Sequence, residues 1–425
     1  MASSEEDRTR PYVIVSSDTH AGLQCEEYRP YLDSKYHPQF DDYVKERHTM
    51  RRLAEEVNGE YIEQWESENA EGLRGAYDPE VRDKELDADG IAGEIIFADG
   101  DAVTGMESPP FGAGLAAGQI TDPELAFAGA AAHNRWLIEF CATNPPRRAG
   151  VGLVPITFGV ERAVEEVEAL AGKPGIKGVM IPTMWHDFES YSSKIYDPVW
   201  AACADAGLVV HTHSGEADMD AYHNNIPIFI TEVVWWTHRT LWHLLYSGKF
   251  EQFPKLKYAV VEAGSWWVGD LLMKGDTNFG GAKKVKKMSS RMKGLLSKLP
   301  SEYFGTNVFI GASTMSKEEI RRRHVNGINA LMWGTDYPHP EGSWPHTVER
   351  LETDFQDVSI EDTRRLLGLN AVDAYGLDLP ALEEVAARVG PTPAQLNQNP
   401  ELRTPPDAER TARWWLDEYN CQFHG

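Results

Sequence analysis

Short apolar runs recur along the chain, and polar or glycine-containing residues follow each of them. The eight runs are Tyr12–Ser17, Gly93–Ala98, Gly150–Ile156, Ile176–Pro182, Leu208–His213, Lys257–Glu262, Asn307–Ala312 and Ala330–Gly334. Runs that are apolar at nearly every position are typical of strands buried on both faces of a parallel sheet. Helix-like stretches such as Thr157–Ala171 and Pro198–Ala206 lie between them.

Strands that alternate with helices indicate βαβ units, and eight such units predict an α/β fold of the (β/α)8 TIM-barrel type. A doubly wound open sheet is the alternative. Two insertions exceed what a minimal barrel needs, residues 21–80 after the first strand and residues 265–303 after the sixth. We expect residues 1–390 to form the barrel with its insertions. Residues 391–425 should form a helical C-terminal extension that packs on the barrel or on a partner subunit.

Composition and charge narrow the class of protein. Of the 425 residues, 42% are hydrophobic and 25% charged, which allows a sizeable core. The net charge of −25 disfavours binding of nucleic acid over a broad face, because phosphate contacts need Lys and Arg. The four cysteines form no CxxC pair, the N-terminus lacks an apolar signal core, and no stretch approaches the length of a membrane span. These features predict a cytoplasmic protein without a membrane segment.

Metal-binding side chains gather at the predicted strand ends, where a (β/α)8 barrel has its active site. Side chains on a strand alternate between its faces, so Asp18 and His20 share one face, as do His211 and His213. Two such pairs on separate strands can converge on one ion. His211 and His339 are each either a ligand or a group that orients a ligand or the substrate. The polar side chains at or just after the ends of the predicted strands are Asp18, His20, Asp99, His211, His213, Glu262, Ser313, Thr314, Asp336 and His339.

Four segments together resemble the amidohydrolase-related ("amidohydrolase 2") family of the amidohydrolase superfamily. They are SSDTH at 16–20, THSG at 212–215, FPKLKYAVVEAGSWW at 253–267 and WGTDYPHPEG at 333–342. The resemblance covers most of the chain and implies a metal-dependent (β/α)8 barrel. By motif position it implies Asp18 and His20 as ligands from the first strand, His213 as the ligand from the fifth and Asp336 as the carboxylate of the eighth.

The chain departs from the family pattern at the sixth strand, where decarboxylase members usually carry a histidine and this sequence has Glu262. It also lacks a carbamylated-type lysine at the end of the fourth strand, because Lys177 precedes the core of that strand. A carboxylate can bridge two cations more readily than an imidazole. The sequence therefore permits two metal ions bound by Asp18, His20, His213, Glu262 and Asp336.

Mixed imidazole and carboxylate donors suit iron, and equally manganese or zinc. Glu232 is one further candidate ligand. Its alternative role is to anchor the aromatic segment around it or to pair with Arg239.

Three longer segments are similar to a long-form branch of this family, the non-haem diiron monooxygenases of platensimycin-type diterpenoid biosynthesis. They are ITEVVWWTHRTLW at 230–242, SEYFGTNVFIGAS at 301–313 and YPHPEGSWPH at 337–346. This resemblance implies two iron ions, O2 as a co-substrate and hydroxylation of a bulky terpenoid carried as a coenzyme A thioester.

Thirteen tryptophans suit a pocket for an apolar substrate, although most should pack helices against the barrel. The predicted pocket residues are Trp235, Trp236, Trp266 and Trp267.

A lysine-rich cluster between Lys283 and Lys298 offers a site for coenzyme A phosphates, but a solvated helix face is the favoured interpretation. The aromatic segment at 413–423 predicts a homo-oligomer.

We expect a metal-dependent enzyme and favour the diiron monooxygenase. The alternative is a zinc- or manganese-dependent hydrolase or decarboxylase, in which Asp336 is the general base and His339 or His211 orients the substrate. A non-catalytic binding barrel has no need for so many ligands at strand ends. A Ser-His-Asp hydrolase is disfavoured because the sequence has no G-x-S-x-G elbow.

Overall fold

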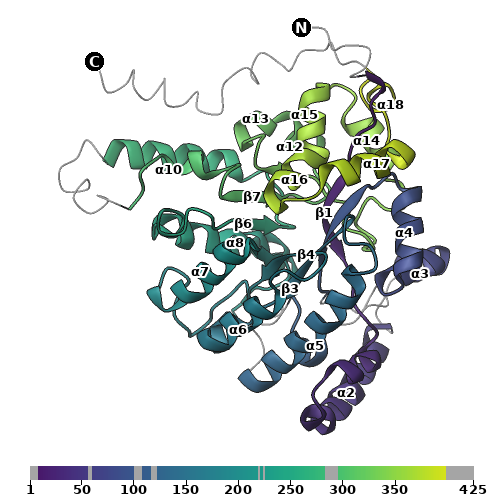
Figure 1. Ribbon diagram of the computed structural model, residues 1–425, viewed down its shortest axis with the longest axis vertical. Coiled ribbons are helices and arrows are strands. Elements are labelled where there is room, and N and C mark those ends of the chain that lie inside the picture. The colour runs from purple at the N-terminus through teal and green to yellow at the C-terminus, as the bar shows by residue number, and fades with distance from the viewer. Residues whose placement is uncertain are drawn as a thin grey trace.

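In the computed structural model, the eight predicted strands form one parallel sheet that curves into a barrel (Figure 1). The structure describes residues 8–55, 60–99, 108–115, 122–218, 221–223, 225–282 and 295–398. The strands are β1 (Val15–His20), β2 (Gly93–Phe97), β3 (Arg148–Leu153), β4 (Ile176–Met180), β5 (Val209–His213), β6 (Tyr258–Val261), β7 (Val308–Gly311) and β8 (Leu331–Met332). They pair in chain order, as in a (β/α)8 barrel and unlike a doubly wound sheet. The predicted fold is confirmed.

The barrel closes between β8 and β1 through separate hydrogen bonds. β8 has only two residues, and the chain after it continues beside β1 as irregular structure. His20 N donates to Tyr337 O at 2.7 Å, and Asp336 N donates to Asp18 O at 2.9 Å. This seam therefore joins the carboxyl end of β1 directly to the segment that carries Asp336.

Helices cover the outside of the barrel (Figure 1). The insertion after β1 contains α2 (His37–Glu55) and α3 (Glu60–Leu73), and the insertion after β6 begins with α10 (Val268–Ala282). The other helices are α4 (Pro79–Ala88), α5 (Pro123–Cys141), α6 (Val160–Leu170), α7 (Asp197–Ala206), α8 (Ile226–Tyr246), α9 (Lys249–Gln252), α12 (Lys317–Arg321), α13 (Arg323–Asn326), α14 (Thr347–Asp354), α15 (Ile360–Arg364), α16 (Asn370–Tyr375), α17 (Leu379–Val389) and α18 (Pro393–Leu396).

Short 3-10 turns and one π-helical turn link these elements. The 3-10 turns are Cys25–Tyr31, Ser34–Tyr36, Arg74–Ala76, Pro110–Gly112, Ile156–Phe158, Lys194–Tyr196 and Pro300–Tyr303, and the π-helical turn is Arg365–Leu369. Most of the predicted lysine cluster, at 283–294, and the aromatic segment at 413–423 lie outside the described residues. Among the helices that are described, none has both the length and the apolar character needed to cross a bilayer.

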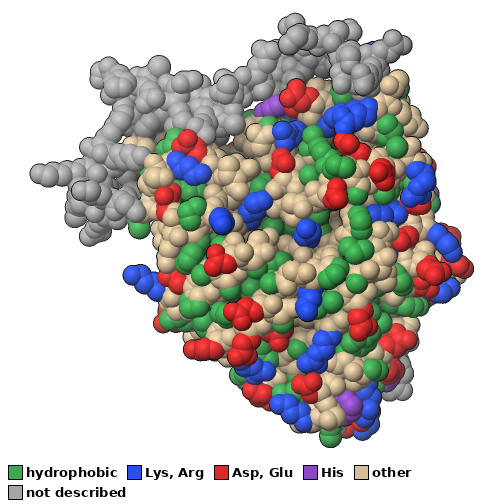
Figure 2. Space-filling view, viewed as in Figure 1, with side chains coloured by type: hydrophobic (Ala, Val, Ile, Leu, Met, Phe, Trp, Pro, Cys, Tyr) green, Lys and Arg blue, Asp and Glu red, His purple; other side chains and the backbone are tan. Residues whose placement is uncertain are grey.

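The strands read as unbroken apolar runs because both of their faces are buried. Alternate side chains point into the barrel or outward against the helices. Ile95 and Phe97 belong to the interior cluster, whereas Ile96 belongs to the cluster between sheet and helices. On the face shown in Figure 2, Lys and Arg side chains are interspersed with Asp and Glu rather than gathered in one basic patch.

Asp89, at the end of α4, connects that helix to α14. Its Oδ1 accepts a hydrogen bond from Thr347 N at 2.9 Å, whereas its Oδ2 is buried without a hydrogen-bond partner. Burial raises the pKa of Asp89 from 3.8 to about 7. Between these two pH values the folded protein holds a proton that the unfolded chain releases, so stability falls as the pH rises through this window.

We expect Asp89→Asn to raise the free energy of unfolding at pH 8 by about 1–2 kcal/mol and to change it little at pH 4. Denaturant unfolding at the two pH values measures this difference. Asp87→Asn is the matched control: Asp87 is partly buried, but Arg388 and Arg147 lower its pKa, so its replacement should destabilise the protein at pH 8. An equal effect of Asp89→Asn at both pH values would contradict the assignment.

Candidate metal centre

Eight acidic and imidazole side chains meet at the carboxyl ends of the strands. One group contains Asp18, His20, His213 and Glu262, a second contains His20, Asp99 and His339, and a third contains Asp336, His339 and Glu341. Within each group, the ligand atoms all lie within 4.8 Å of one another. The first two groups share His20 and the last two share His339, so together they form one continuous centre at the mouth of the barrel.

His20 lies at the middle of this centre. Its Nδ1 donates to Ala98 O at 3.2 Å, which fixes the ring and turns Nε2 toward Asp18 Oδ1 at 3.6 Å and Asp336 Oδ1 at 3.4 Å. The buried Nε2 has no hydrogen-bond partner. Two ligand atoms that each lie about 2.1 Å from one ion are separated by about 3.0–3.4 Å. The spacing around His20 Nε2 is thus close to that of ligands of a shared cation.

His213, at the end of β5, lies between two carboxylates. Its Nε2 is 3.1 Å from Asp18 Oδ1, and its Nδ1 is 3.2 Å from Glu262 Oε2. Burial alone would lower the pKa of His213, but Asp18 and Glu262 raise it to about 9. Burial raises the pKa of Glu262 to about 8, and the negative charges of Asp336 and Asp18 add to this shift. A cation bound here would relieve the repulsion among these acids.

His339 also belongs to the centre. Its Nε2 is 3.3 Å from Asp99 Oδ2, its Nδ1 is 3.1 Å from Asp336 Oδ1, and its ring stacks on His20 with the centroids 4.2 Å apart. Burial opposes a charge on His339, yet Asp336 and Asp99 raise its pKa well above the ordinary value. Conversely, despite burial, His339 and His20 lower the pKa of Asp336.

Backbone strain is concentrated at the same strand ends. Glu262, Ser313 and Asp336 have φ values of 56°, 50° and 60°. A positive φ is uncommon for residues other than glycine and costs about 1–3 kcal/mol. Ser313 Oγ donates a hydrogen bond to Asp18 Oδ2, so this strained residue orients a candidate ligand. Strain of this kind indicates that the tertiary structure holds these residues in place for a function.

His211 is not brought to the centre, although it is on the same strand as His213. Its Nδ1 donates to Val179 O at 3.1 Å, and its Nε2 accepts from Tyr375 OH at 2.8 Å. Burial lowers the pKa of His211 to about 3, which keeps the ring neutral. Both ring nitrogens are therefore engaged within the barrel core.

Glu232 belongs to none of the groups found among the described residues. It is exposed on α8 and accepts a hydrogen bond from Tyr222 OH at 2.8 Å, and that hydroxyl accepts one from Trp236 Nε1 at 2.6 Å. Arg239 stacks on Trp236 and on Trp185 instead of pairing with Glu232. Glu232 is thus linked through Tyr222 to Trp236 of the aromatic segment.

The four predicted pocket tryptophans have different environments. Trp267 is only 4% exposed and stacks on His238, so it packs α8 against the chain after β6. Trp266 and Trp235 are 56% and 49% exposed. Trp235 lines an apolar groove of about 480 Å³, together with Trp242, Tyr246, Leu271, Lys274, Gly275, Asn278 and Phe279. This groove lies between α8 and α10.

Asp99 and Glu341 belong to these groups but not to the predicted ligands, and the sequence analysis places Asp99 only among the strand-end side chains. Asp99 directly follows the second apolar run, at the same level as the other strand-end acids, and this position was the available signal. Glu341 is exposed in the segment after His339 and carries no such signal.

Comparisons with known proteins agree with this architecture. The amidohydrolase family model (Amidohydro_2) matches residues 97–377, about two thirds of the chain. No curated protein sequence matches. An amidohydrolase structure from Mycobacterium avium subsp. paratuberculosis K-10 is 20% identical, covers 86% of this chain and 99% of its own, and has a TM-score of 0.61.

Two decarboxylase structures are similar to a comparable degree. The 5-carboxyvanillate decarboxylase of Sphingomonas paucimobilis is 18% identical, with 86% of this chain and 100% of that chain covered and a TM-score of 0.59. The 5-carboxyvanillate decarboxylase of Novosphingobium aromaticivorans, complexed with manganese and 4-hydroxy-3-methoxy-5-nitrobenzoic acid, is 18% identical, with 88% and 100% covered and a TM-score of 0.61. At these identities the similarity shows a shared fold.

Proposed function

The chain belongs to the amidohydrolase family, and from this premise we propose that it is a metal-dependent decarboxylase or hydrolase. The first cation would be held by Asp18, His20, His213 and Glu262. The observation that carries the proposal is the buried His20 Nε2, which has no hydrogen-bond partner and faces two carboxylates at a spacing close to that of ligands. The sequence favoured a monooxygenase, but the similar structures include several decarboxylases and do not support that prediction.

The donor set fits a divalent cation. Imidazole nitrogens mixed with carboxylate oxygens suit manganese, iron and zinc. Groups behind the ligands orient them, as metal sites generally require: Ala98 O holds His20, and Ser313 holds Asp18. We favour manganese, because the similar structure from Novosphingobium aromaticivorans contains it.

A cation bound there would polarise a substrate carboxylate or carbonyl oxygen as a Lewis acid. Asp336 and His339 supply the proton chemistry, because the lowered pKa of Asp336 keeps it ionised and the raised pKa of His339 keeps it protonated. In a decarboxylation, His339 would donate the proton that replaces the departing CO2 on carbon. In a hydrolysis, Asp336 would accept the proton of the attacking water.

We propose a small aromatic or otherwise apolar carboxylic acid as the substrate. The exposed indole of Trp266 follows the end of β6 in the chain and offers apolar surface. The similar decarboxylases are named for aromatic acids, 5-carboxyvanillate and 2,6-dihydroxybenzoate.

A diiron monooxygenase is the second candidate. The observation that favours it is the group of His20, Asp99 and His339 directly beside the first group, which would allow two cations to be bound side by side. Iron would be the preferred metal and O2 the co-substrate on this proposal, with an apolar substrate such as a terpenoid thioester of coenzyme A.

Metal removal combined with anaerobic assay separates the two candidates. We expect dialysis against a chelator to abolish turnover of a panel of aromatic carboxylic acids, and Mn²⁺ or Zn²⁺ to restore it under nitrogen. A requirement for both Fe²⁺ and O2 would favour the monooxygenase instead. Full activity of protein shown by elemental analysis to be metal-free would contradict both.

A further inference from the structure

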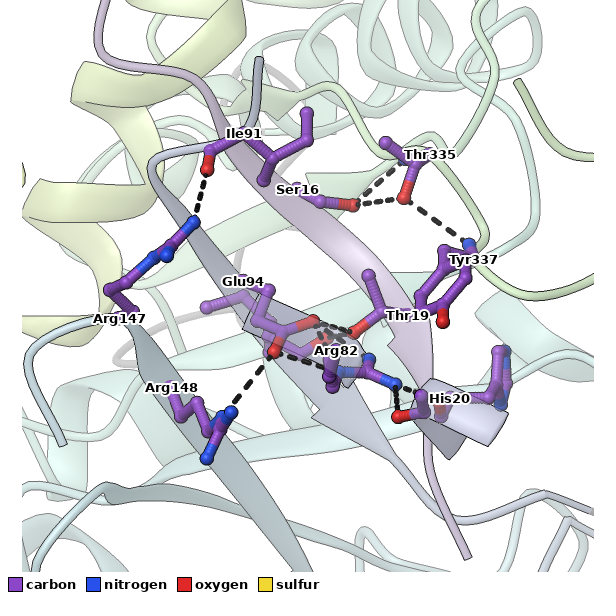
Figure 3. Close-up of polar contacts among 12 residues, drawn as sticks. Ser16, Thr19, His20, Arg82, Ile91, Glu94, Arg147, Arg148, Thr335 and Tyr337 are labelled. Carbon is purple, nitrogen blue, oxygen red and sulfur yellow. Dashed lines mark hydrogen bonds and ion pairs between the residues drawn. The ribbon is translucent and has the colours of Figure 1, made fainter. Parts of the chain in front are cut away.

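A buried ion pair lies directly behind the metal-binding end of β1 (Figure 3). Arg82 of α4 and Glu94 of β2 are both fully buried, and Arg82 Nε and Nη2 donate to the Glu94 carboxylate at 2.9 and 2.7 Å. The remaining nitrogen, Nη1, donates to His20 O at 2.9 Å and to Gly75 O at 3.1 Å. Burial of charges is costly unless they are paired and hydrogen-bonded, and this guanidinium meets both conditions.

The pair also contacts β1 through Thr19, which lies between Asp18 and His20. Thr19 Oγ1 is 3.1 Å from Glu94 Oε2 and donates to Ile95 O at 2.9 Å. Neighbouring side chains on a strand point to opposite faces. A hydroxyl anchored on the outer face therefore sets how Asp18 and His20 project into the barrel.

The β1–β2 ladder does not fix this part of β1 by itself. Ser16 pairs with Glu94 and Thr19 pairs with Ile96, so β1 has one residue more than β2 between these two pairs. An extra residue of this kind disrupts the ladder locally and bends the strand. Asp18 lies within the irregular stretch, so contacts outside the β1–β2 ladder, among them Asp336 N to Asp18 O at 2.9 Å, contribute to its position.

Arg82 also contacts the segment after β8. Its guanidinium carbon lies 4.9 Å from the centre of the Tyr337 ring, and Tyr337 directly follows Asp336. The Tyr337 carbonyl in turn accepts the hydrogen bond from His20 N at 2.7 Å. One guanidinium thus contacts both ligand-bearing segments of the barrel seam.

We propose that Arg82 and Glu94 are positioning residues for the cation, which hold Asp18, His20 and Asp336 at the correct spacing from the outer side of the sheet. This inference rests on the proposed function, since it assumes that a cation binds Asp18 and His20, with Asp336 beside it. Loss of groups that orient ligands typically weakens metal binding by about 10- to 100-fold.

Arg147, directly before β3, provides a matched control near the opposite end of β2. It is 5% exposed, and it donates to Asp87 Oδ1 and Ile91 O, both at 2.8 Å, and to Ala92 O at 3.2 Å. These contacts lie at the amino end of β2, away from the metal centre (Figure 3). A change at Arg147 should affect stability but not metal binding.

The test is a calorimetric titration of Mn²⁺ into the full-length protein, with the melting temperature recorded for each variant. We expect Thr19→Val and Arg82→Lys to weaken Mn²⁺ binding about 10- to 100-fold. Arg147→Lys should lower the melting temperature and leave Mn²⁺ affinity within about twofold of the wild type. Thr19→Val changes only one hydroxyl for a methyl group, so it carries the test if Arg82→Lys does not fold.

The outcomes separate this inference from the proposed function. A wild-type protein that binds neither Mn²⁺ nor Zn²⁺ overturns both. If the wild type binds the metal and folded Thr19→Val and Arg82→Lys bind it equally well, the proposed function stands and the positioning role is wrong. An equal loss of affinity in Arg147→Lys would show a general effect of destabilisation, and this also overturns the positioning role.

Discussion

Replacement of His213 by alanine should remove the divalent cation and abolish turnover, while the barrel stays folded. The imidazole lies between Asp18 and Glu262, at 3.1 and 3.2 Å, and its loss leaves these acids facing one another without a nitrogen donor. We expect metal affinity to fall by more than about 100-fold, beyond the effect of losing a group that only orients a ligand. Elemental analysis and calorimetric titration measure the loss, and His20→Ala should behave in the same way.

His211 is the control for this experiment, because it is a buried histidine two residues earlier on the same strand. Its two ring nitrogens bond to Val179 O and Tyr375 OH, not to the metal centre. His211→Gln should therefore lower the melting temperature but keep the metal. Full metal stoichiometry in both His213→Ala and His20→Ala would overturn the ligand assignment, whereas loss of metal in His211→Gln alone would exchange the roles of the two histidines.

The strands and the common orientation of Asp18 and His20 could be predicted from the sequence because both depend on local periodicity. A strand buried on both faces must be apolar at nearly every position, and its alternation places Asp18 and His20 on one face. The same rule could not separate His211 from His213. Both side chains point into the barrel, and only the position along β5 decides which of them lies at the carboxyl end of the strands.

Other features depend on contacts between distant parts of the chain. Glu232 lies near the candidate ligands in sequence, but Tyr222 engages it on the outside of α8. Arg82 and Glu94 look like ordinary surface charges in a helix and a strand, and only the packing of α4 on β2 shows that they form a buried pair. The left-handed backbone at Glu262 likewise has no signal in a single sequence, because the surrounding structure imposes it.

If two cations bind, as the diiron candidate requires, replacement of Asp99 by asparagine together with His339 by alanine should lower their number from about two per chain to about one. An imidazole nitrogen has one lone pair, so His20 can bind only one of two neighbouring ions. Asp336 has two oxygens and lies between the groups, 3.4 Å from His20 Nε2 and 3.1 Å from His339 Nδ1. A carboxylate there can bridge two ions, and removal of Asp99 and His339 would leave only the first group of ligands intact.

Metal analysis of protein saturated with Mn²⁺ measures this change, and the single variant His213→Ala provides the opposite case, since it should empty the first position. A wild-type stoichiometry of one that the double variant retains would exclude a second ion. A double variant with no metal would instead show that the eight side chains serve one position, because His339 and Asp99 would then be as necessary as His213. Such a single shared position would remove the observation that favours the diiron monooxygenase and leave the decarboxylase or hydrolase proposal intact.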